Sequence, residues 1–168
     1  EIVAKTITVD MHNHGPRPAA PNSAAQVAPL GSRQRDTSVP NAMKRAGDSV
    51  VCLAYAVDGS LMRGGDPAPG TRSNLVRDPK PGELYESHLQ YEDAYDKLFA
   101  SVPALQRVRR YSDIEAAHKE SRPAIIQDAE GADFLEKGHL DRLEAAYSRG
   151  LRKLQLVHYA VNDIADFQ

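Results

Sequence analysis

The stretch Ser49-Val50-Val51-Cys52-Leu53-Ala54-Tyr55-Ala56-Val57 is a continuous apolar run, and it decides the fold class. A strand with one wet face alternates apolar and polar residues, whereas a strand covered on both faces is apolar throughout. Strands of the second kind belong to parallel sheets, whose crossover helices lie against the sheet. The run therefore predicts a buried strand of a parallel α/β sheet.

Three further segments have the character of strands, and helical patterns separate them. Further strands are expected at residues 6–10, 124–126 and 151–158. Apolar residues on one helical face predict helices over residues 83–102 and 139–149, and capping signals predict helices over residues 39–46 and 112–119. A capping box starting at Ser112 is expected to open the third helix. Because strand and helix alternate four times, we expect right-handed βαβ units.

Composition narrows the class of protein. The 168 residues are 41% hydrophobic and 26% charged, as in a soluble globular domain. The 21 basic and 23 acidic residues form no basic block, which argues against nucleic-acid binding. The single cysteine, Cys52, excludes both an intrachain disulfide and a cysteine-based zinc site.

The location in the cell is not decided by the sequence. No apolar stretch reaches the roughly 18 residues that a membrane span requires. The first residues lack the pattern of a signal peptide. We expect a chain that is soluble as given, and either cytoplasmic or exported after removal of a leader.

Two histidines follow the first predicted strand. In Asp10-Met11-His12-Asn13-His14 they lie two residues apart, so in an extended chain they project from the same face. Sites in parallel α/β folds are built at the C-terminal ends of strands, and two neutral imidazoles there suit zinc. The alternative is a pair of solvated loop histidines.

An acidic residue and a third histidine follow two other strands. Glu130, in Gln127-Asp128-Ala129-Glu130-Gly131, could bridge two cations roughly 3.5 to 4 Å apart, although a carboxylate before glycine is also an ordinary turn former. His158 ends the last strand and could bind metal or donate a hydrogen bond to a substrate oxygen. Asp128 and Asp133 are either supporting groups or surface carboxylates. Three strand ends thus carry candidate groups at one rim.

With these residues in view, the chain resembles the membrane (renal) dipeptidase family of zinc hydrolases, a branch of the amidohydrolase-type (β/α)8 barrels. The resemblance lies in the first-strand motif, in Ala129-Glu130-Gly131, and in the segment from Leu140 to Asn162. It implies two zinc ions, with His12, His14 and Glu130 as metal ligands and Glu130 and His158 as catalytic residues. The residues implied to bind substrate are His158, Tyr159 and Asn162.

The chain differs from the family pattern at His14, and it is shorter than a complete barrel. His14 stands where the familiar dipeptidases have Asp, which gives the His-x-His pattern of the wider amidohydrolase group. A (β/α)8 barrel needs about 250 residues, so four strands cannot close it. We therefore expect residues 1–168 to be the N-terminal half of one catalytic barrel domain, with long loops over residues 15–36 and 59–82.

Three functions are compatible with the residues. The first is hydrolysis of dipeptides by a hydroxide bound to two zinc ions. The second is another amidohydrolase-type reaction on an amide, lactone or phosphoester. The third is a non-catalytic half-barrel that assembles with a partner chain. The first two require the second half of the barrel, which either the same polypeptide or a second chain would supply. The sequence is also compatible with a homo-oligomer.

Overall fold

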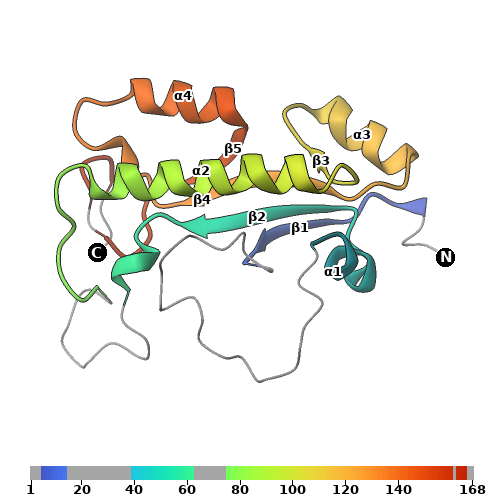
Figure 1. Cartoon of the computed structure of the whole chain (residues 1–168), viewed down its shortest axis with the longest axis horizontal. Helices are drawn as coiled ribbons and strands as arrows, with labels where there is room; N and C mark the ends of the chain where they lie inside the picture. The colour runs from blue at the N-terminus through green and yellow to red at the C-terminus, as the bar shows by residue number, and fades with distance from the viewer. Residues whose placement is uncertain (1–4, 15–38, 63–74, 161, 166–168) are drawn as a thin grey trace.

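The computed structural model describes residues 5–14, 39–62, 75–160 and 162–165. A single five-stranded parallel sheet organises them. Its strands are β1 (Val9–Asn13), β2 (Val50–Ala56), β3 (Gln106–Arg107), β4 (Ala124–Glu130) and β5 (Leu151–Gln155). β4 is central, because it pairs with β2 along one edge and with both β3 and β5 along the other. Figure 1 shows the strands side by side, with β1 outside β2.

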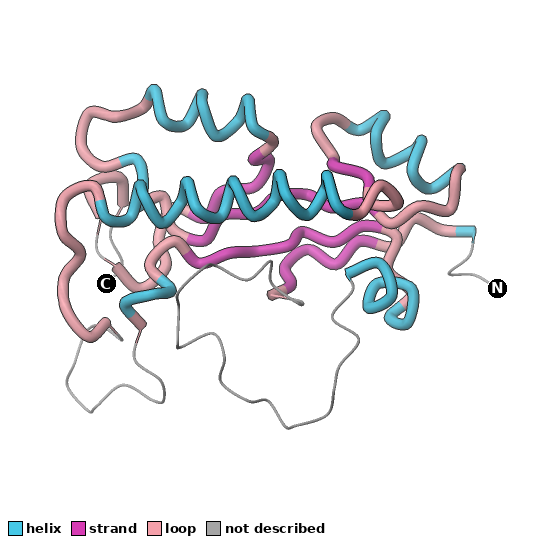
Figure 2. The backbone as a smooth tube through the Cα atoms, in the orientation of Figure 1, coloured by secondary structure: helices cyan, strands magenta, loops and turns pink. Residues whose placement is uncertain are grey.

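The helices connect the strands as crossovers. They are α1 (Val39–Ala46), α2 (Glu83–Ser101), α3 (Tyr111–Lys119) and α4 (Asp141–Arg149), with short 3-10 turns at Gly59–Leu61 and Asp133–Leu135. In Figures 1 and 2, α2 runs along the length of β2, while α3 and α4 lie beyond it at opposite ends. The alternation predicted from the sequence is confirmed, and α1 has the predicted bounds. Within the described ranges, none of the helices has the length and apolarity needed to cross a membrane.

The main core lies between β2 and α2. All seven residues of β2 are buried, which confirms the strand predicted from the apolar run. Tyr55 stacks on Tyr91 of α2 with ring centroids 4.8 Å apart, and Tyr95 donates a hydrogen bond of 2.5 Å to the carbonyl oxygen of Leu53. Aromatic pairs of this kind contribute about 0.5–1.5 kcal/mol beyond the area that they bury. The core therefore fixes β2, and through it the sheet.

The first strand begins later than predicted. Residues 6–8 were expected in the strand, but pairing with β2 begins at Val9, opposite Val50. Thr8 instead ties the chain to the start of β2, since its hydroxyl donates to the carbonyl oxygen of Gly47 at 2.7 Å. At its other end β1 also differs from the prediction, since it extends to Asn13 rather than Asp10. His12 thus lies in the strand rather than after it.

The other two site-bearing strands also differ from the prediction. β4 continues past Ile126 to Glu130, because its polar residues pair with β2 and β5 on both sides. β5 ends at Gln155 rather than at His158. The side chain of Gln155 donates a hydrogen bond of 2.6 Å to the carbonyl oxygen of Val157, in the segment after the strand. The polar residues after Ile126 therefore led to a predicted end of β4 that is too early, and the apolar residues before His158 to a predicted end of β5 that is too late.

Two smaller features were also mispredicted. The two-residue strand β3 was not expected, since nothing so short has a sequence pattern of its own. The N-cap of α3 is Arg110 rather than Ser112. Asp113 accepts from the backbone N–H groups of Arg109 and Arg110, at 2.7 and 3.0 Å, and so caps the helix two residues earlier. The predicted loop over residues 15–36 lies outside the described residues, as do residues 63–74 of the second loop.

Candidate metal centre

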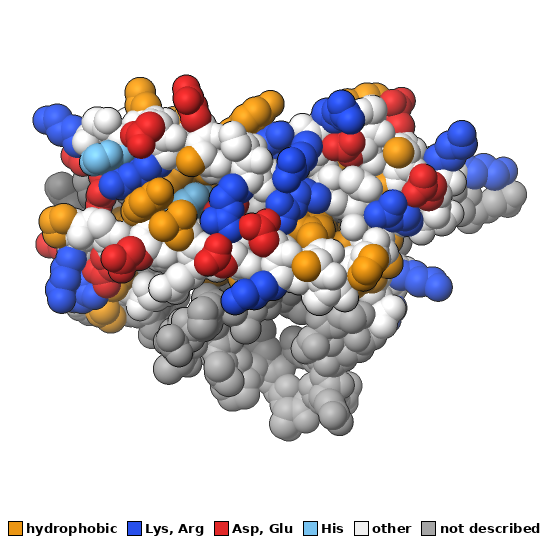
Figure 3. Space-filling model, turned by 45° about the horizontal axis from the view of Figure 1, so that its top comes forward, with side chains coloured by type: hydrophobic (Ala, Val, Ile, Leu, Met, Phe, Trp, Pro, Cys, Tyr) orange, Lys and Arg blue, Asp and Glu red, His pale blue; other side chains and the backbone are white. Residues whose placement is uncertain are grey.

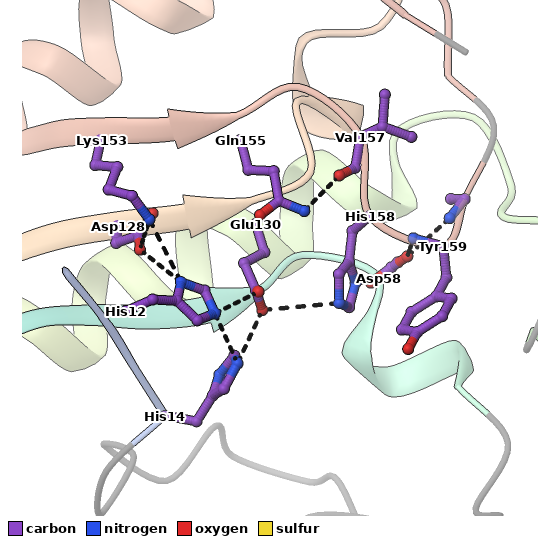
Figure 4. Close-up of polar contacts among 11 residues, drawn as sticks. His12, His14, Asp58, Asp128, Glu130, Lys153, Gln155, Val157, His158 and Tyr159 are labelled. Carbon is purple, nitrogen blue, oxygen red and sulfur yellow. Dashed lines mark hydrogen bonds and ion pairs between the residues drawn. The ribbon is translucent and has the colours of Figure 1, made fainter. Parts of the chain in front are cut away.

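Three of the predicted ligands meet at the C-terminal ends of β1 and β4 (Figure 4). His12 Nε2 lies 2.7 Å from Glu130 Oε1, and His14 Nε2 lies 3.4 Å from Glu130 Oε2. The two histidine Nε2 atoms are 3.1 Å apart. One ligand atom from each of the three residues lies within 4.8 Å of the others. The chain thus brings together, from positions more than 100 residues apart, two imidazoles and a carboxylate.

The end of β1 is shaped by Asp10. Its carboxylate accepts the backbone N–H of His12 at 3.1 Å and the side-chain amide of Asn13 at 2.6 Å. The hydrogen bond from Asn13, opposed by partial burial and helped by the backbone of His12, lowers the pKa of Asp10. The register with β2 shifts between Asp10 and Asn13. Asp10 therefore holds the irregular strand end that presents the histidines.

Glycine is required after Glu130 for a steric reason. Gly131 has a φ of +92°, in the region that disfavours side chains, and a Cβ there would collide with the carboxylate of Asp133. The backbone N–H of Gly131 donates to the carbonyl oxygen of Gln155 at 3.1 Å. The Glu-Gly pair therefore ends β4 while keeping it attached to β5.

The donor set fits a divalent cation. The side chain of Glu130 is only 6% exposed, and its buried Oε2 has no hydrogen-bond partner among the described residues. A buried carboxylate oxygen is costly unless something positive satisfies it. Two imidazole nitrogens that face each other at 3.1 Å also share a need for a proton or a cation between them. Imidazole and carboxylate ligands together suit zinc and related borderline metals.

His158 joins this centre from the loop after β5. Its Nε2 lies 3.7 Å from Glu130 Oε2, and its Nδ1 donates to Asp58 at 2.6 Å. Burial alone would lower the pKa of His158, but the Asp58 hydrogen bond and the charges of Asp58, Glu130 and Asp133 together raise it. The ring is therefore held with one nitrogen on Asp58 and the other turned toward Glu130.

Asp58 was missed by the sequence reasoning. Its side chain is fully buried at the C-terminal end of β2, and besides His158 it accepts the backbone N–H groups of Tyr159 and Ala160 at 3.0 and 2.9 Å. An acidic residue directly after a buried strand was the available signal. Lys153, which lies beside His12 and Asp128, was also missed, because in sequence it is an ordinary polar residue of a strand.

Tyr159 and Asn162 follow His158 in the segment after β5. The Tyr159 ring meets His158 edge-on, with centroids 4.4 Å apart. The Asn162 amide donates to Asp133 at 3.1 Å and to the Leu156 carbonyl oxygen at 2.9 Å, while its oxygen accepts two backbone N–H groups of its own loop. Asn162 thus shapes the loop that carries His158, and direct contact with substrate stays a prediction for both residues.

Asp133 is a buried acid whose charge destabilises the fold. Burial, reinforced by the charge of Asp58 and opposed by the Asn162 hydrogen bond, raises the pKa of Asp133 to about 6. Since this value lies above that of the unfolded chain, the folded state binds more protons between about pH 4 and pH 6, and lowering the pH relieves the cost. We expect Asp133→Asn to raise the free energy of unfolding at pH 7.5 by roughly 1–3 kcal/mol.

The advantage of Asp133→Asn should shrink to near zero at pH 4. Chemical denaturation of both proteins at the two pH values measures it. Asp163→Asn, an exposed acid of the following loop, is the matched control and should change neither value. An advantage that grows toward low pH would contradict the prediction.

The model of the membrane dipeptidase family, peptidase family M19, matches residues 1–167. The chain belongs to the membrane dipeptidase family. The resemblance inferred from the strand-end motifs is thereby confirmed. No sequence among the curated proteins matches the chain.

Solved structures agree with the family on the fold. Dipeptidase AC, described as a metallopeptidase of family M19, is 20% identical with a TM-score of 0.63, covering 92% of this chain and 43% of its own. A metallopeptidase from Rhodobacter sphaeroides, bound to a phosphinate mimic of L-Ala-D-Ala, is 18% identical with a TM-score of 0.64, covering 92% and 46%. An amidohydrolase from Pseudomonas aeruginosa is 12% identical with a TM-score of 0.62, covering 96% and 37%.

The chain therefore spans less than half the length of each of these three proteins. Its parallel sheet and crossover helices form the first half of a TIM-type barrel, as members of the membrane dipeptidase family build it. The predicted fold class is confirmed.

Proposed function

We propose that this chain supplies one half of the active site of a metal-dependent dipeptidase, which hydrolyses the peptide bond of small dipeptides with two zinc ions. The observation that carries the proposal is the convergence of His12, His14 and Glu130 within 4.8 Å, in a chain of the membrane dipeptidase family. The match with a metallopeptidase that binds a dipeptide mimic supports the substrate class.

Glu130 is proposed to hold both cations. Its two oxygens face different partners, since Oε1 meets His12 while Oε2 faces His14 and His158. A carboxylate in this position can bridge, with His12 and His14 completing part of one coordination shell. Two cations bound here would acidify water near neutral pH and polarise the substrate carbonyl.

His158 is proposed to stabilise the charge that develops on the carbonyl oxygen. Its Nδ1–H is committed to Asp58, so a proton on Nε2 is directed toward the centre at Glu130. A preorganised donor of this kind acts most strongly in a dry site, and the side chain of His158 is only 14% exposed. Tyr159 and Asn162, on the same loop, are proposed to line the substrate side of the site.

The remaining ligands are proposed to come from the second half of the barrel. Among the described strands, β5 has a partner on one edge only, and apolar side chains stand exposed beside it: Leu140, Leu143, Tyr147 and Leu156. Figure 3, in which the top of Figure 1 is turned forward, shows hydrophobic side chains exposed among basic and acidic ones on that face. We propose that the same polypeptide or a second chain covers this edge and completes one catalytic domain.

The direct test combines metal analysis with turnover. The purified protein is expected to contain close to two zinc ions per complete site and to hydrolyse dipeptides, including those with a D-residue at the C-terminal position. A chelator should abolish hydrolysis, and added zinc should restore it. Absence of any divalent ion from the purified protein would overturn the proposal and favour a non-catalytic half-barrel.

A second candidate reaction rests on His14. The pattern His12-x-His14 replaces the His-x-Asp of the familiar dipeptidases and is shared with amidohydrolase-type enzymes of other specificity. A substrate panel separates the two reactions. Turnover of lactones, other amides or phosphotriesters without turnover of dipeptides would replace the first candidate by the second.

Asp58→Asn tests the role of His158. An amide holds the His158 ring in place less firmly and does not stabilise its positive charge, so kcat/KM for a dipeptide should fall about 10- to 100-fold. Zinc content should stay unchanged, because Asp58 contacts none of the three proposed ligands through a described hydrogen bond. Asp163→Asn serves as the exposed control. A loss of zinc in proportion to the loss of activity would contradict this role for Asp58.

A further inference from the structure

Asp128 is a buried carboxylate with no part in the reaction described so far. It lies on β4 two residues before Glu130, so both side chains project from the same face of the sheet. Its side chain is fully buried, and its Oδ2 lies 3.1 Å from Nδ1 of His12. The nitrogen of His12 that faces away from Glu130 therefore meets a second carboxylate, as Figure 4 shows.

Lys153 faces the same carboxylate from β5. It is the register partner of Asp128 in the β4–β5 ladder, and its Nζ lies 2.5 Å from Asp128 Oδ2. The same Nζ lies 3.4 Å from His12 Nδ1. His12 Nδ1 thus has two neighbours of opposite preference, since the carboxylate can only accept a hydrogen bond and the ammonium can only donate one.

The choice between these neighbours decides which ring nitrogen of His12 can bind a cation. If Nδ1–H donates to Asp128, then Nε2 carries a lone pair, which points at the space between Glu130 and His14. If Lys153 donates to Nδ1 instead, the proton of the neutral ring lies on Nε2, and that nitrogen cannot be a ligand. The tautomer of a metal-binding histidine is set in this way by the partner of its other nitrogen.

We propose that Asp128 is the positioning residue of the metal centre. It holds His12 in the Nδ1–H tautomer by accepting a hydrogen bond from the His12 ring while it forms an ion pair with Lys153. The ion pair keeps the Lys153 ammonium from donating to the ring. This inference rests on the proposed function, because it assumes that the centre binds a divalent cation.

The competition between Asp128 and Lys153 predicts a pattern across variants. Asp128→Ala frees Lys153 to donate to His12, and Zn²⁺ affinity should fall about 100-fold, at the upper end of the usual effect for such supporting groups. Lys153→Met should change the affinity by less than about 10-fold, since Asp128 remains. The double variant removes both neighbours and should recover at least 10-fold of the affinity that Asp128→Ala loses. A residue with a merely structural role would show no such recovery.

The experiment measures Zn²⁺ affinity by competition with a chromophoric chelator, using the purified protein after metal removal. Asp96→Ala is the matched control, because it also removes an ion-paired carboxylate, one bound to Arg107 and Arg149 rather than to the centre. Asp128→Asn, which keeps the side-chain volume, is measured alongside in case the alanine variant does not fold, and should weaken binding at least 10-fold. Circular dichroism checks each fold.

A second measurement needs no variant. The ¹⁵N chemical shifts of the His12 ring in the metal-free wild-type protein should show the proton on Nδ1. A proton on Nε2, or Asp128 variants that bind Zn²⁺ within 3-fold of the wild type, would overturn the proposal while leaving the metal centre intact. A wild-type protein that binds no Zn²⁺ would instead defeat the proposed function itself.

Discussion

Replacing Glu130 with Gln is expected to lower kcat/KM for dipeptide hydrolysis by at least about 1,000-fold. The amide keeps the size of the side chain but loses the negative charge, and with it the ability to bridge two cations. Because supporting groups alone cost 10- to 100-fold when they are removed, a shared ligand should cost more. Zinc content should fall by at least one ion per site, which elemental analysis of the purified variant measures.

Glu136→Gln is the control for Glu130→Gln. Its carboxylate also lies after β4 and is also hydrogen-bonded, to Arg142 and to the backbone of Gly82, but it takes no part in the centre. It should retain full zinc content and activity within a few-fold of the wild type. Full zinc content in Glu130→Gln would argue that Glu130 is no ligand.

The largest effect on stability is expected for Phe134→Ala, with a loss of about 3–5 kcal/mol in the free energy of unfolding. Phe134 is fully buried, and its ring stacks on His88 of α2 with centroids 3.9 Å apart and planes within 5°. It follows the Glu-Gly turn directly, in the 3-10 turn Asp133–Leu135. The truncation leaves a cavity between this turn and α2 that the packed surroundings cannot fill.

Phe99→Ala provides the comparison for Phe134→Ala. Phe99 is only partly buried at the border of the core, with the Arg107 guanidinium 4.4 Å from its ring centroid and the Tyr95 ring centroid 6.3 Å away. About 1–2 kcal/mol should be lost, because less apolar surface is withdrawn from water. Urea denaturation of the two variants measures both values. Equal losses would show that Phe134 has no special place in the core.

The sequence was sufficient to predict β2 and the meeting of the three proposed ligands, for two separate reasons. An unbroken apolar run allows few structures other than a buried strand, so β2 differs from its prediction by one residue at each end. Predicting that the proposed ligands meet required only the rule that parallel strands end at one edge of a sheet. His12, His14 and Glu130 therefore came together although the ends of β1 and β4 were both misplaced.

The groups that contact the histidines of the site could not be predicted in the same way. Asp58 acts on a histidine 100 residues away, and the partner of Asp128 is a lysine 25 residues later. Neither pairing follows from a local pattern, because each depends on which strands are neighbours and in which register. Asp128 was foreseen only as a supporting group or a surface carboxylate, and its complete burial excludes the second.

The residues of the centre come from strands that differ in how many neighbouring strands they pair with. Glu130 and Asp128 belong to β4, which neighbours on both edges hold in place. His12 belongs to β1 and His14 follows it, and β1 pairs with β2 alone among the described strands. An outer strand opens more readily than a central one. A cation bound between them would therefore act as a tether between an outer strand of the described sheet and its central strand.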